Sequence, residues 1–317
     1  MKNVLVTGAS GLIGRKVCSG LLKKGYGVIA TDKSPHEYNE GKERYHFISA
    51  EITDEESIQK LFRDYKIDAV VHCACTADND FGHIITENEI KISSAVDGFL
   101  YAMASAEGVG HFILISTTQV YELPKTREPI RETDKVKITT NYAKLKYDSE
   151  TVLSNQVLLN QDMITAAIRV APVYTSDFYD NLMSKVIDAD GVPFMYRTGD
   201  YGFQFCCLHN LVDFILCYLR VAETNRYTGI YNMADRYIST AAEIVKFIRQ
   251  RYRLGPVIQK NIGVDGMKSV LGIIKNREES KTNYRYNDFG SFFNNNVIDA
   301  TKASKICSER WNLQNTK

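Results

Sequence analysis

Short apolar runs alternate with amphipathic stretches through the first 170 residues of the chain. Such runs, bounded by Gly, Asp or Ser, predict strands, while apolar residues spaced three and four apart predict helices. The predicted strands are Val4–Thr7, Val28–Asp32, His46–Ser49, Asp68–Cys73, His111–Ser116 and Thr165–Val170. The predicted helices are Arg15–Lys24 with Gly25 as its stop, Asp54–Tyr65 with Asp54 as its N-cap, and about 84–107 and 141–153. Continuous apolar strands that alternate with helices indicate a parallel sheet buried on both faces, so we predict a doubly wound α/β domain.

After residue 170 the pattern becomes less regular. We predict helices over Phe178–Ile187, Leu208–Ala222 and Thr240–Tyr252, a strand over Ile230–Met233, and a polar, loop-like stretch over Lys275–Asn296. The change in pattern divides the chain into a first domain, residues 1–170, and a smaller second α/β domain, residues 171–317. Parts of 205–235 are expected to return to the first domain.

The candidate functional residues follow the strands of the first domain. Gly8–Gly14, Asp32, Cys73–Cys75 and Ser116–Thr118 each lie at the carboxyl end of a predicted strand. In a doubly wound sheet these ends lie at one edge, where ligands bind. We therefore expect one binding site at this edge.

Three glycines, Gly8, Gly11 and Gly14, separate the first strand from the first helix. A tight turn needs residues without a Cβ, and a helix that starts there directs free N–H groups and its positive dipole end at an anion. The pyrophosphate of a dinucleotide fits such a turn, although a glycine-rich turn that binds nothing is the plain alternative. Asp32 stands where a carboxylate accepts hydrogen bonds from both ribose hydroxyls, which favours NAD over NADP. Lys33 weakens that preference, and a solvated loop acid is the alternative reading.

A second pattern is Tyr142-x-x-x-Lys146 on a predicted helix. Positions four apart share a helix face, and an ammonium beside a phenol stabilises the phenolate. The pair can therefore act as an acid and base that moves a hydroxyl proton during hydride transfer. Taken alone the spacing fits an exposed helix better, but its position, one crossover after the fifth predicted strand and downstream of the glycine turn, favours the acid/base pair. The hydroxyls of Ser116, Thr117 and Thr118 can hold a substrate oxygen or simply cap the strand.

Composition restricts the classes of function. Among 317 residues, 39 Lys and Arg balance 38 Asp and Glu, so we expect no nucleic-acid partner. No apolar run reaches the length of a membrane helix, and the strand pattern begins at residue 3, which leaves no room for a signal peptide. The seven cysteines form no Cys-x-x-Cys pair. They indicate free thiols in a reducing compartment, so we expect a cytoplasmic protein without a bound metal. The short apolar runs add the expectation that the protein does not contact a membrane.

Taken together, these motifs resemble the NAD-dependent epimerase/dehydratase family of extended short-chain dehydrogenase/reductases. The matching segments are Gly8-x-x-Gly11-x-x-Gly14, Asp32, Ser116-Thr117 with Val120-Tyr121, Tyr142-x-x-x-Lys146, Ile168–Tyr174, Ile230–Met233 and Asp299-Ala-Thr-Lys302 with Trp311. The resemblance covers nearly the whole chain. It implies a Rossmann-type domain, a C-terminal substrate domain, and a homodimer formed through the helix of Tyr142 and its predecessor.

The resemblance also implies roles for residues around the cofactor. The implied cofactor contacts are Gly8, Gly11, Leu12, Ile13 and Gly14 at the pyrophosphate, Asp32 at the ribose, Ile52 at the adenine, and Cys73, Ala74 and Cys75 beneath the dinucleotide. Thr117 matches the catalytic Ser or Thr of the family and Tyr142 its acid/base. Lys146 is expected to hold the nicotinamide ribose and to tune the tyrosine.

Departures from the family pattern concern the substrate. Thr118 and Gln119 replace the Asp-Glu pair with which the 4,6-dehydratases eliminate water, and we assign both residues to substrate binding. The stretch 201–205 lacks the arginine that usually binds a diphosphate, so Arg197, Arg236 or an arginine of the tail is expected to substitute. Otherwise the substrate lacks a diphosphate.

The sequence thus predicts an NAD-dependent enzyme that modifies a sugar, first of all a nucleotide-sugar epimerase. Two alternatives stay open. One is an NAD(P)-dependent dehydrogenase or reductase, and the other is a non-catalytic protein that binds NAD as a sensor or scaffold.

Overall fold

The computed structural model covers most of the chain. The structure describes residues 2–35, 42–75, 84–122, 128–159, 162–188, 190–196, 202–221, 227–261, 263 and 297–316. Two expectations, the substrate contact of Arg197 and the loop over Lys275–Asn296, lie outside these residues.

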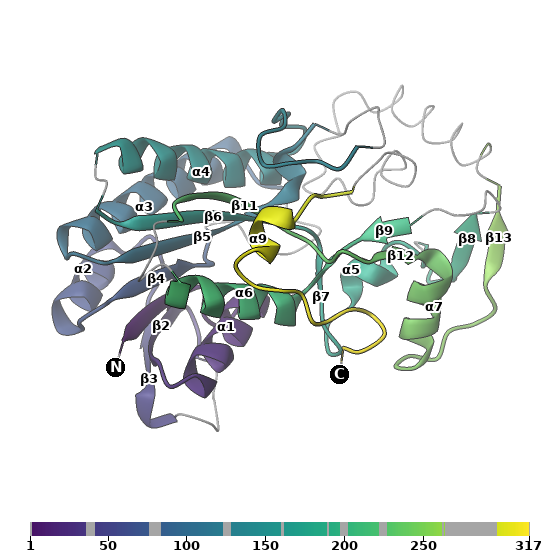
Figure 1. Cartoon of the computed structure of the whole chain (residues 1–317), viewed down its shortest axis with the longest axis horizontal. Helices are drawn as coiled ribbons and strands as arrows, with labels where there is room; N and C mark the ends of the chain where they lie inside the picture. The colour runs from purple at the N-terminus through teal and green to yellow at the C-terminus, as the bar shows by residue number, and fades with distance from the viewer. Residues whose placement is uncertain are drawn as a thin grey trace.

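A seven-stranded parallel sheet forms the centre of the larger part of the protein, with strand order β11-β6-β5-β4-β1-β2-β3 (Figure 1). The strands are β1 (Asn3–Thr7), β2 (Gly27–Asp32), β3 (Tyr45–Ser49), β4 (Ala69–His72), β5 (His111–Thr117), β6 (Ile164–Val170) and β11 (Gly229–Met233). The order reverses direction between β1 and β4, which is the switch point of a doubly wound sheet. The predicted fold class is confirmed.

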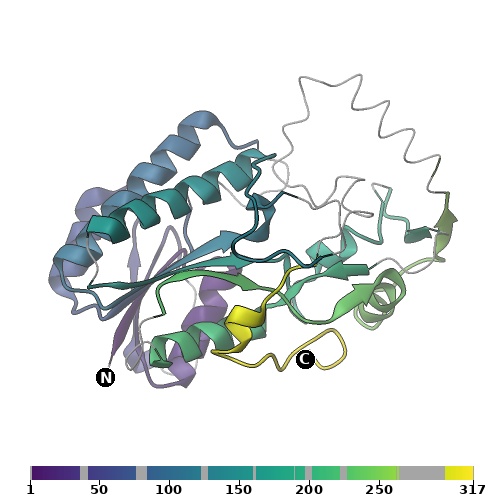
Figure 2. The ribbon, with the colours of Figure 1, turned by 45° about the horizontal axis from the view of Figure 1, so that its top comes forward.

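Helices cover both faces of this sheet, as Figures 1 and 2 show. On one face lie α1 (Leu12–Lys23) and α6 (Leu208–Val221), and on the other α2 (Glu55–Asp64), α3 (Glu87–Ala106) and α4 (Asn141–Leu159). Successive strand residues point to opposite faces, so Val4 and Val6 join the core under α1 while Leu5 joins the core under α2. The sheet is therefore buried on both sides.

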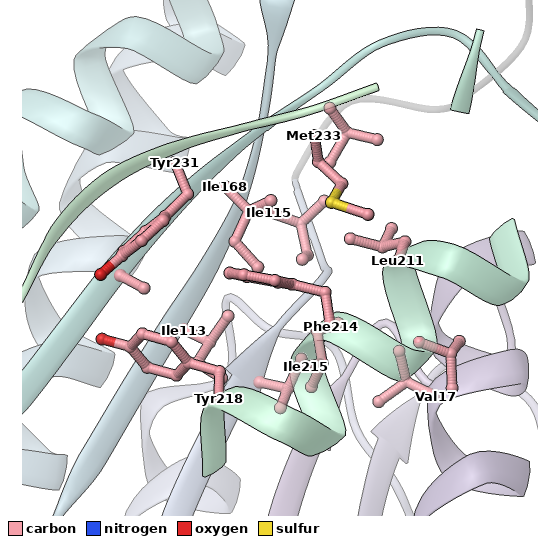
Figure 3. Close-up of a cluster of buried hydrophobic side chains, with 14 of the residues drawn as sticks. Val17, Ile113, Ile115, Ile168, Leu211, Phe214, Ile215, Tyr218, Tyr231 and Met233 are labelled. Atoms are coloured by element: carbon pink, nitrogen blue, oxygen red, sulfur yellow. The ribbon is translucent and has the colours of Figure 1, made fainter. Parts of the chain in front are cut away.

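Figure 3 shows the core on the α6 face. Ile115 and Ile168 of the sheet meet Phe214 of α6, and the rings of Tyr218 and Tyr231 pack with their centroids 5.6 Å apart. Each of the two tyrosine hydroxyls donates a hydrogen bond of 2.7 Å to the Tyr227 carbonyl. Burial of each such ring stabilises the fold by about 1.5–3 kcal/mol. β11 thus adds an edge strand beside β6, and α6 covers one face of the sheet, although both elements come late in the chain.

The remaining described elements form a smaller part beside the sheet, around a separate apolar cluster. It contains three strand pairs and two helices: β7 (Val173–Tyr174) with β10 (Cys206–Cys207), β9 (Gly202–Gln204) with β12 (Ile238–Thr240), β8 (Phe194–Tyr196) with β13 (Ile258–Lys260), α5 (Asp180–Met183) and α7 (Ala241–Arg249). The division at residue 170 remains a prediction. α6 and β11 follow this residue in the chain but pack with the large sheet. A short helix, α9 (Thr301–Ser304), precedes the C-terminal segment.

Local predictions were mostly confirmed. Asp54 caps α2 by accepting a hydrogen bond from Ser57 N at 3.2 Å, and Gly25 follows α1 at φ +82°. The helix expected over Phe178–Ile187 was wrong in length, because α5 ends at Met183 and Ile187 pairs with Pro193 in an antiparallel bridge. Within the described part of the chain, no helix is long and apolar enough to cross a membrane.

Candidate active site

A cleft of about 820 Å³ lies at the carboxyl ends of the central strands. It brings together thirteen residues singled out from the sequence: Gly8, Gly11, Leu12, Ile13, Gly14, Asp32, Ile52, Cys73, Ala74, Cys75, Thr117, Tyr142 and Lys146. Thr118 and Gln119 form the short 3-10 helix η2 (Thr118–Val120) and do not line the cleft, and Arg197 falls outside the described residues. One site thus collects segments that are more than 130 residues apart.

The glycine turn is packed so closely that side chains are excluded. A Cβ on Gly14 would lie 2.0 Å from the Gly8 carbonyl oxygen, and one on Gly8, at φ +63°, would lie 2.7 Å from Ala74 N. Gly11 is the N-cap of α1 and has no side chain that could accept a hydrogen bond from the first N–H groups of the helix. The turn and helix start therefore fit an anionic group such as pyrophosphate.

Asp32 lies at the end of β2, beside the glycine turn. One carboxylate oxygen accepts a hydrogen bond from Ser10 N at 2.9 Å, and the other accepts one from Lys33 N at 2.7 Å. Each oxygen has a second lone pair, so the carboxylate can also accept from ribose hydroxyls. Asp32 thus ties the turn to the end of β2, while Ile52 provides an apolar surface nearby in the same cleft.

Thr117, Tyr142 and Lys146 line the same cleft from two elements. Thr117 ends β5 and accepts a hydrogen bond from Gln119 N at 3.3 Å, while Tyr142 and Lys146 lie one turn apart on α4. The side chain of Lys146 is nearly buried and lowers the pKa of Cys73, which burial raises to about 12. Cys73 is therefore a neutral thiol in the cleft floor near neutral pH.

Sequence reasoning missed a buried ion pair beneath these residues. Arg169 of β6 donates to both carboxylate oxygens of Glu150 on α4, at 2.7–3.1 Å, and Ser116 of β5 also donates to that carboxylate. The Arg169 guanidinium lies 4.6 Å from the centre of the Tyr121 ring. Burial acts to lower the pKa of Arg169, but its hydrogen bonds to the Glu150 carboxylate and that negative charge raise it above the usual value. One available signal was the position of Glu150, eight residues after Tyr142 and on the same face of the helix.

A second buried network holds the cleft floor. His72 Nδ1 lies 2.6 Å from Thr7 Oγ1, which accepts a hydrogen bond from Ala74 N at 3.3 Å. His72 Nε2 lies 2.8 Å from Asp97, which also accepts from Ser149. His72 is thus a buried histidine whose two ring nitrogens are both hydrogen-bonded.

A second wall of the cleft, apart from the one formed by the glycine turn and α1, comes from the segment after β7. Phe178, Asp180 and Asn181 line it. Lys16 of α1 reaches across to Asp177, with N–O distances of 3.0 and 3.2 Å, so the two walls are linked by an ion pair. Among the described lining residues the cations are Lys33 and Lys146, and neither belongs to this wall.

No cluster of three or more His, Cys, Asp or Glu side chains in the described ranges is arranged to hold a metal ion. The groups that converge on the cleft are instead a glycine turn, a carboxylate, a phenol, an ammonium and a hydroxyl. Such a set suits a dinucleotide and proton transfer at a substrate hydroxyl.

Several known proteins are similar to the chain. It is 29% identical over 167 residues to the UDP-glucose 4-epimerase of Drosophila melanogaster, covering 48% of this chain and 47% of that protein. It is 30% identical over 193 residues to UDP-arabinose 4-epimerase 1 of Arabidopsis thaliana, covering 55% and 44%. The matched region thus spans about half the length of these relatives.

Solved structures share the fold. A UDP-glucose 4-epimerase from Stenotrophomonas maltophilia, solved with NAD and formylated UDP-arabinopyranose, aligns with a TM-score of 0.71 at 18% identity, covering 100% of this chain and 96% of that one. A UDP-glucuronic acid 4-epimerase from Bacillus cereus, solved with NAD, aligns with a TM-score of 0.68 at 18% identity, covering 99% and 93%. The sequence profile of the NAD dependent epimerase/dehydratase family matches residues 4–234. The chain therefore belongs to the NAD-dependent epimerase/dehydratase family.

Proposed function

We propose that the protein binds NAD in the cleft and modifies a nucleotide sugar by reversible hydride transfer, as a nucleotide-sugar epimerase or a closely related enzyme. The observation that carries the proposal is the shared cleft of the glycine turn, Asp32 and the side chains of Thr117, Tyr142 and Lys146. Family membership and the NAD-bound state of two structural neighbours support it.

The cleft has the features that a dinucleotide requires. The Cβ distances at Gly8 and Gly14 hold the backbone tightly wound at the start of α1, where a pyrophosphate would accept hydrogen bonds from N–H groups. Asp32 would accept from the ribose and repel a 2′-phosphate, which favours NAD. Lys146 would contact the nicotinamide ribose from α4.

Bound NAD supplies a hydride acceptor that can return the hydride to the substrate. The Tyr142 phenol would take the proton of the substrate hydroxyl as the hydride leaves, and give it back when the hydride returns. The ammonium of Lys146 favours the phenolate, since an adjacent positive charge stabilises the deprotonated form. The Thr117 hydroxyl would hold the substrate oxygen between the two elements.

The same geometry gives no support to elimination of water. The positions that carry acids in the 4,6-dehydratases are Thr118 and Gln119, which have no acidic group and lie outside the cleft lining. Their substrate contact stays a prediction, as does that of Arg197. We therefore favour epimerisation over dehydration.

A second candidate is a reductase or dehydrogenase that acts on a substrate without a diphosphate. It is favoured by Asp180, an acid on the substrate side of the cleft, and by the lack of a cation among the described lining residues of that wall. A diphosphate beside Asp180 would meet like charge. The names of the relatives, which are UDP-sugar 4-epimerases, favour the first candidate.

The proposal is tested by cofactor content and ligand binding. NAD should be present in an acid extract of the purified protein, and a UDP-sugar should raise the melting temperature of the NAD-loaded protein. Tyr142→Phe should abolish turnover while it retains NAD, and Tyr147→Phe, on the same helix, is the matched control. Net NADH release from a substrate without phosphate would favour the second candidate, and NAD binding without any turnover would leave only a sensor or scaffold.

Assembly and location are further parts of the proposal. Ile92 on α3 is 40% exposed, and α3 packs against α4, so one large apolar side chain is open to solvent on the helix pair proposed to form a homodimer. Light scattering after size exclusion tests the dimer, with Ile92→Lys expected to give monomers. A cytoplasmic location is tested by fractionation of cells that express the full chain.

A further inference from the structure

Two cysteine thiols meet on the far side of α6 from the sheet-facing core residues. Cys217 Sγ on α6 lies 2.9 Å from Cys307 Sγ, which follows α9, and the two positions are 90 residues apart in the chain. Both side chains are half-buried free thiols. A disulfide bond is about 2.05 Å long, so bond formation needs an approach of less than about 1 Å.

The contact belongs to a longer docking of the C-terminal segment along α6, which Figures 1 and 2 show beside that helix. Asn210 accepts from Trp311 N at 3.0 Å and donates to the Trp311 carbonyl at 2.8 Å, and Asp213 accepts from the Trp311 indole at 3.3 Å. Asn210, Asp213 and Cys217 are spaced three and four apart, so they share one helix face. The segment runs antiparallel to the helix, with Cys307 opposite Cys217.

This docking fixes the relative position of the two sulfur atoms. At one end, Lys302 donates to the Ile230 carbonyl at 2.7 Å, and at the other Trp311 is held by two side chains of α6. Cys307 lies between these anchors. The native contacts therefore hold the thiols together before any bond forms.

The surroundings of the two thiols differ. The Arg220 guanidinium donates a hydrogen bond to Cys217 Sγ at 3.8 Å. Burial and the adjacent Cys217 raise the pKa of the Cys307 thiol to about 12. A neighbouring cation favours the reactive thiolate, whereas a buried neutral thiol reacts more slowly. Because Cys217 is the sulfur that contacts a guanidinium, we assign it as the nucleophile that first attacks an oxidant, and Cys307 as the resolving thiol.

We propose that Cys217 and Cys307 are a redox modification site, at which a hydroperoxide converts the two thiols into a disulfide that fastens the C-terminal segment to α6. In the first step the Cys217 thiolate attacks one oxygen of hydrogen peroxide, and the O–O bond breaks. The sulfur becomes a sulfenic acid, and the hydroxide that leaves is protonated to water. In the second step Cys307 sulfur attacks the sulfenic sulfur and a second water leaves. Two thiols and one peroxide thus give one disulfide and two waters, and a dithiol reverses the reaction.

The cross-link would close a 90-residue separation, so its main effect is on stability. A long closed loop restricts the unfolded chain strongly. The proposal is independent of the enzymatic function, because none of these residues lines the cleft.

The test uses the full-length protein, treated with hydrogen peroxide, alkylated with iodoacetamide and digested for mass spectrometry. We expect a linked peptide pair joining Cys217 to Cys307 within one chain, lost on treatment with dithiothreitol. The oxidised protein should melt roughly 3–6 °C above the reduced protein. Cys217→Ser and Cys307→Ser should each lose the linked pair and the rise in melting temperature.

Cys18→Ala is the control, because it removes a free thiol on α1 that lines neither the pair nor the cleft, and it should leave the linked peptide and the rise in melting temperature on oxidation intact. Two single variants at the pair are used in case one of them fails to fold, and circular dichroism shows whether each variant is folded. The proposal is overturned if peroxide yields only sulfinic and sulfonic acids, if the links join other cysteines or two chains, or if Cys217→Ser shows the same rise in melting temperature.

Discussion

The buried pair of Glu150 and Arg169 offers the sharpest test of how the site is supported. The two side chains are 4% and 3% exposed and share three N–H···O bonds of 2.7–3.1 Å. Glu150→Gln removes the negative charge that faces the guanidinium and leaves the positive charge buried. Breaking one partner of a buried pair costs about 3–5 kcal/mol.

The magnitude is checked by a double-mutant cycle. Arg169→Met should cost a similar amount, because it leaves the carboxylate buried among Ser116 and apolar neighbours. The double variant removes both charges and should be no less stable than either single variant. The coupling energy between the two positions is therefore expected to be at least about 3–5 kcal/mol.

Urea denaturation followed by circular dichroism measures these free energies of unfolding. A control lies on the same helix: Lys144 and Asp148 form an ion pair at 2.6 Å, but their side chains are 48% and 31% exposed. Lys144→Ala should cost only about 0.3–0.5 kcal/mol, since water screens an exposed pair. If Glu150→Gln costs no more than Lys144→Ala, or if the double variant shows additive losses, the reasoning is refuted.

Three further predictions concern other residues. Gly14→Ala should weaken NAD binding by more than tenfold in a fluorescence titration, because its Cβ would lie 2.0 Å from the Gly8 carbonyl oxygen, whereas Gly255→Ala, with nothing within 4 Å, should bind normally. Asp32 should make NAD bind roughly five- to tenfold more tightly than NADP, and Asp32→Ser should erase the difference. Burial raises the pKa of Asp235 to about 7, so the folded protein holds this proton more tightly than the unfolded chain, and stability should fall as pH rises from about 4 to 7. In Asp235→Asn that contribution to the pH slope should vanish in thermal melts; an unchanged slope would contradict it.

The large sheet could be read from the sequence because its strands are uninterrupted apolar runs with helices between them. For strands such as Ala69–His72 and helices such as Leu208–Val221, local pattern and tertiary burial agree. The smaller part was harder to predict. Its strands have two or three residues each, so no periodicity develops, and the helix expected over Phe178–Ile187 gives way after Met183 to a turn.

The cleft lining could also be predicted, because the carboxyl ends of parallel strands meet at one edge. The contacts that support the surrounding structure could not be predicted from the sequence. The pairing of Glu150 with Arg169 depends on how α4 is rotated against β5 and β6, and the contact of Cys217 with Cys307 depends on the path of the C-terminal segment. Such long-range registers leave no periodic trace in the sequence.

The most direct test of the central claim uses a nucleotide sugar that raises the melting temperature of the protein, carrying deuterium on the carbon to be oxidised. The purified protein is incubated with it, without added cofactor, and the products are followed by NMR. Reversible hydride transfer within the cleft predicts an epimer that retains the deuterium, with no net NADH, and no epimer from Tyr142→Phe. An epimer that loses the deuterium to solvent, or equal turnover by Tyr142→Phe, would contradict the account.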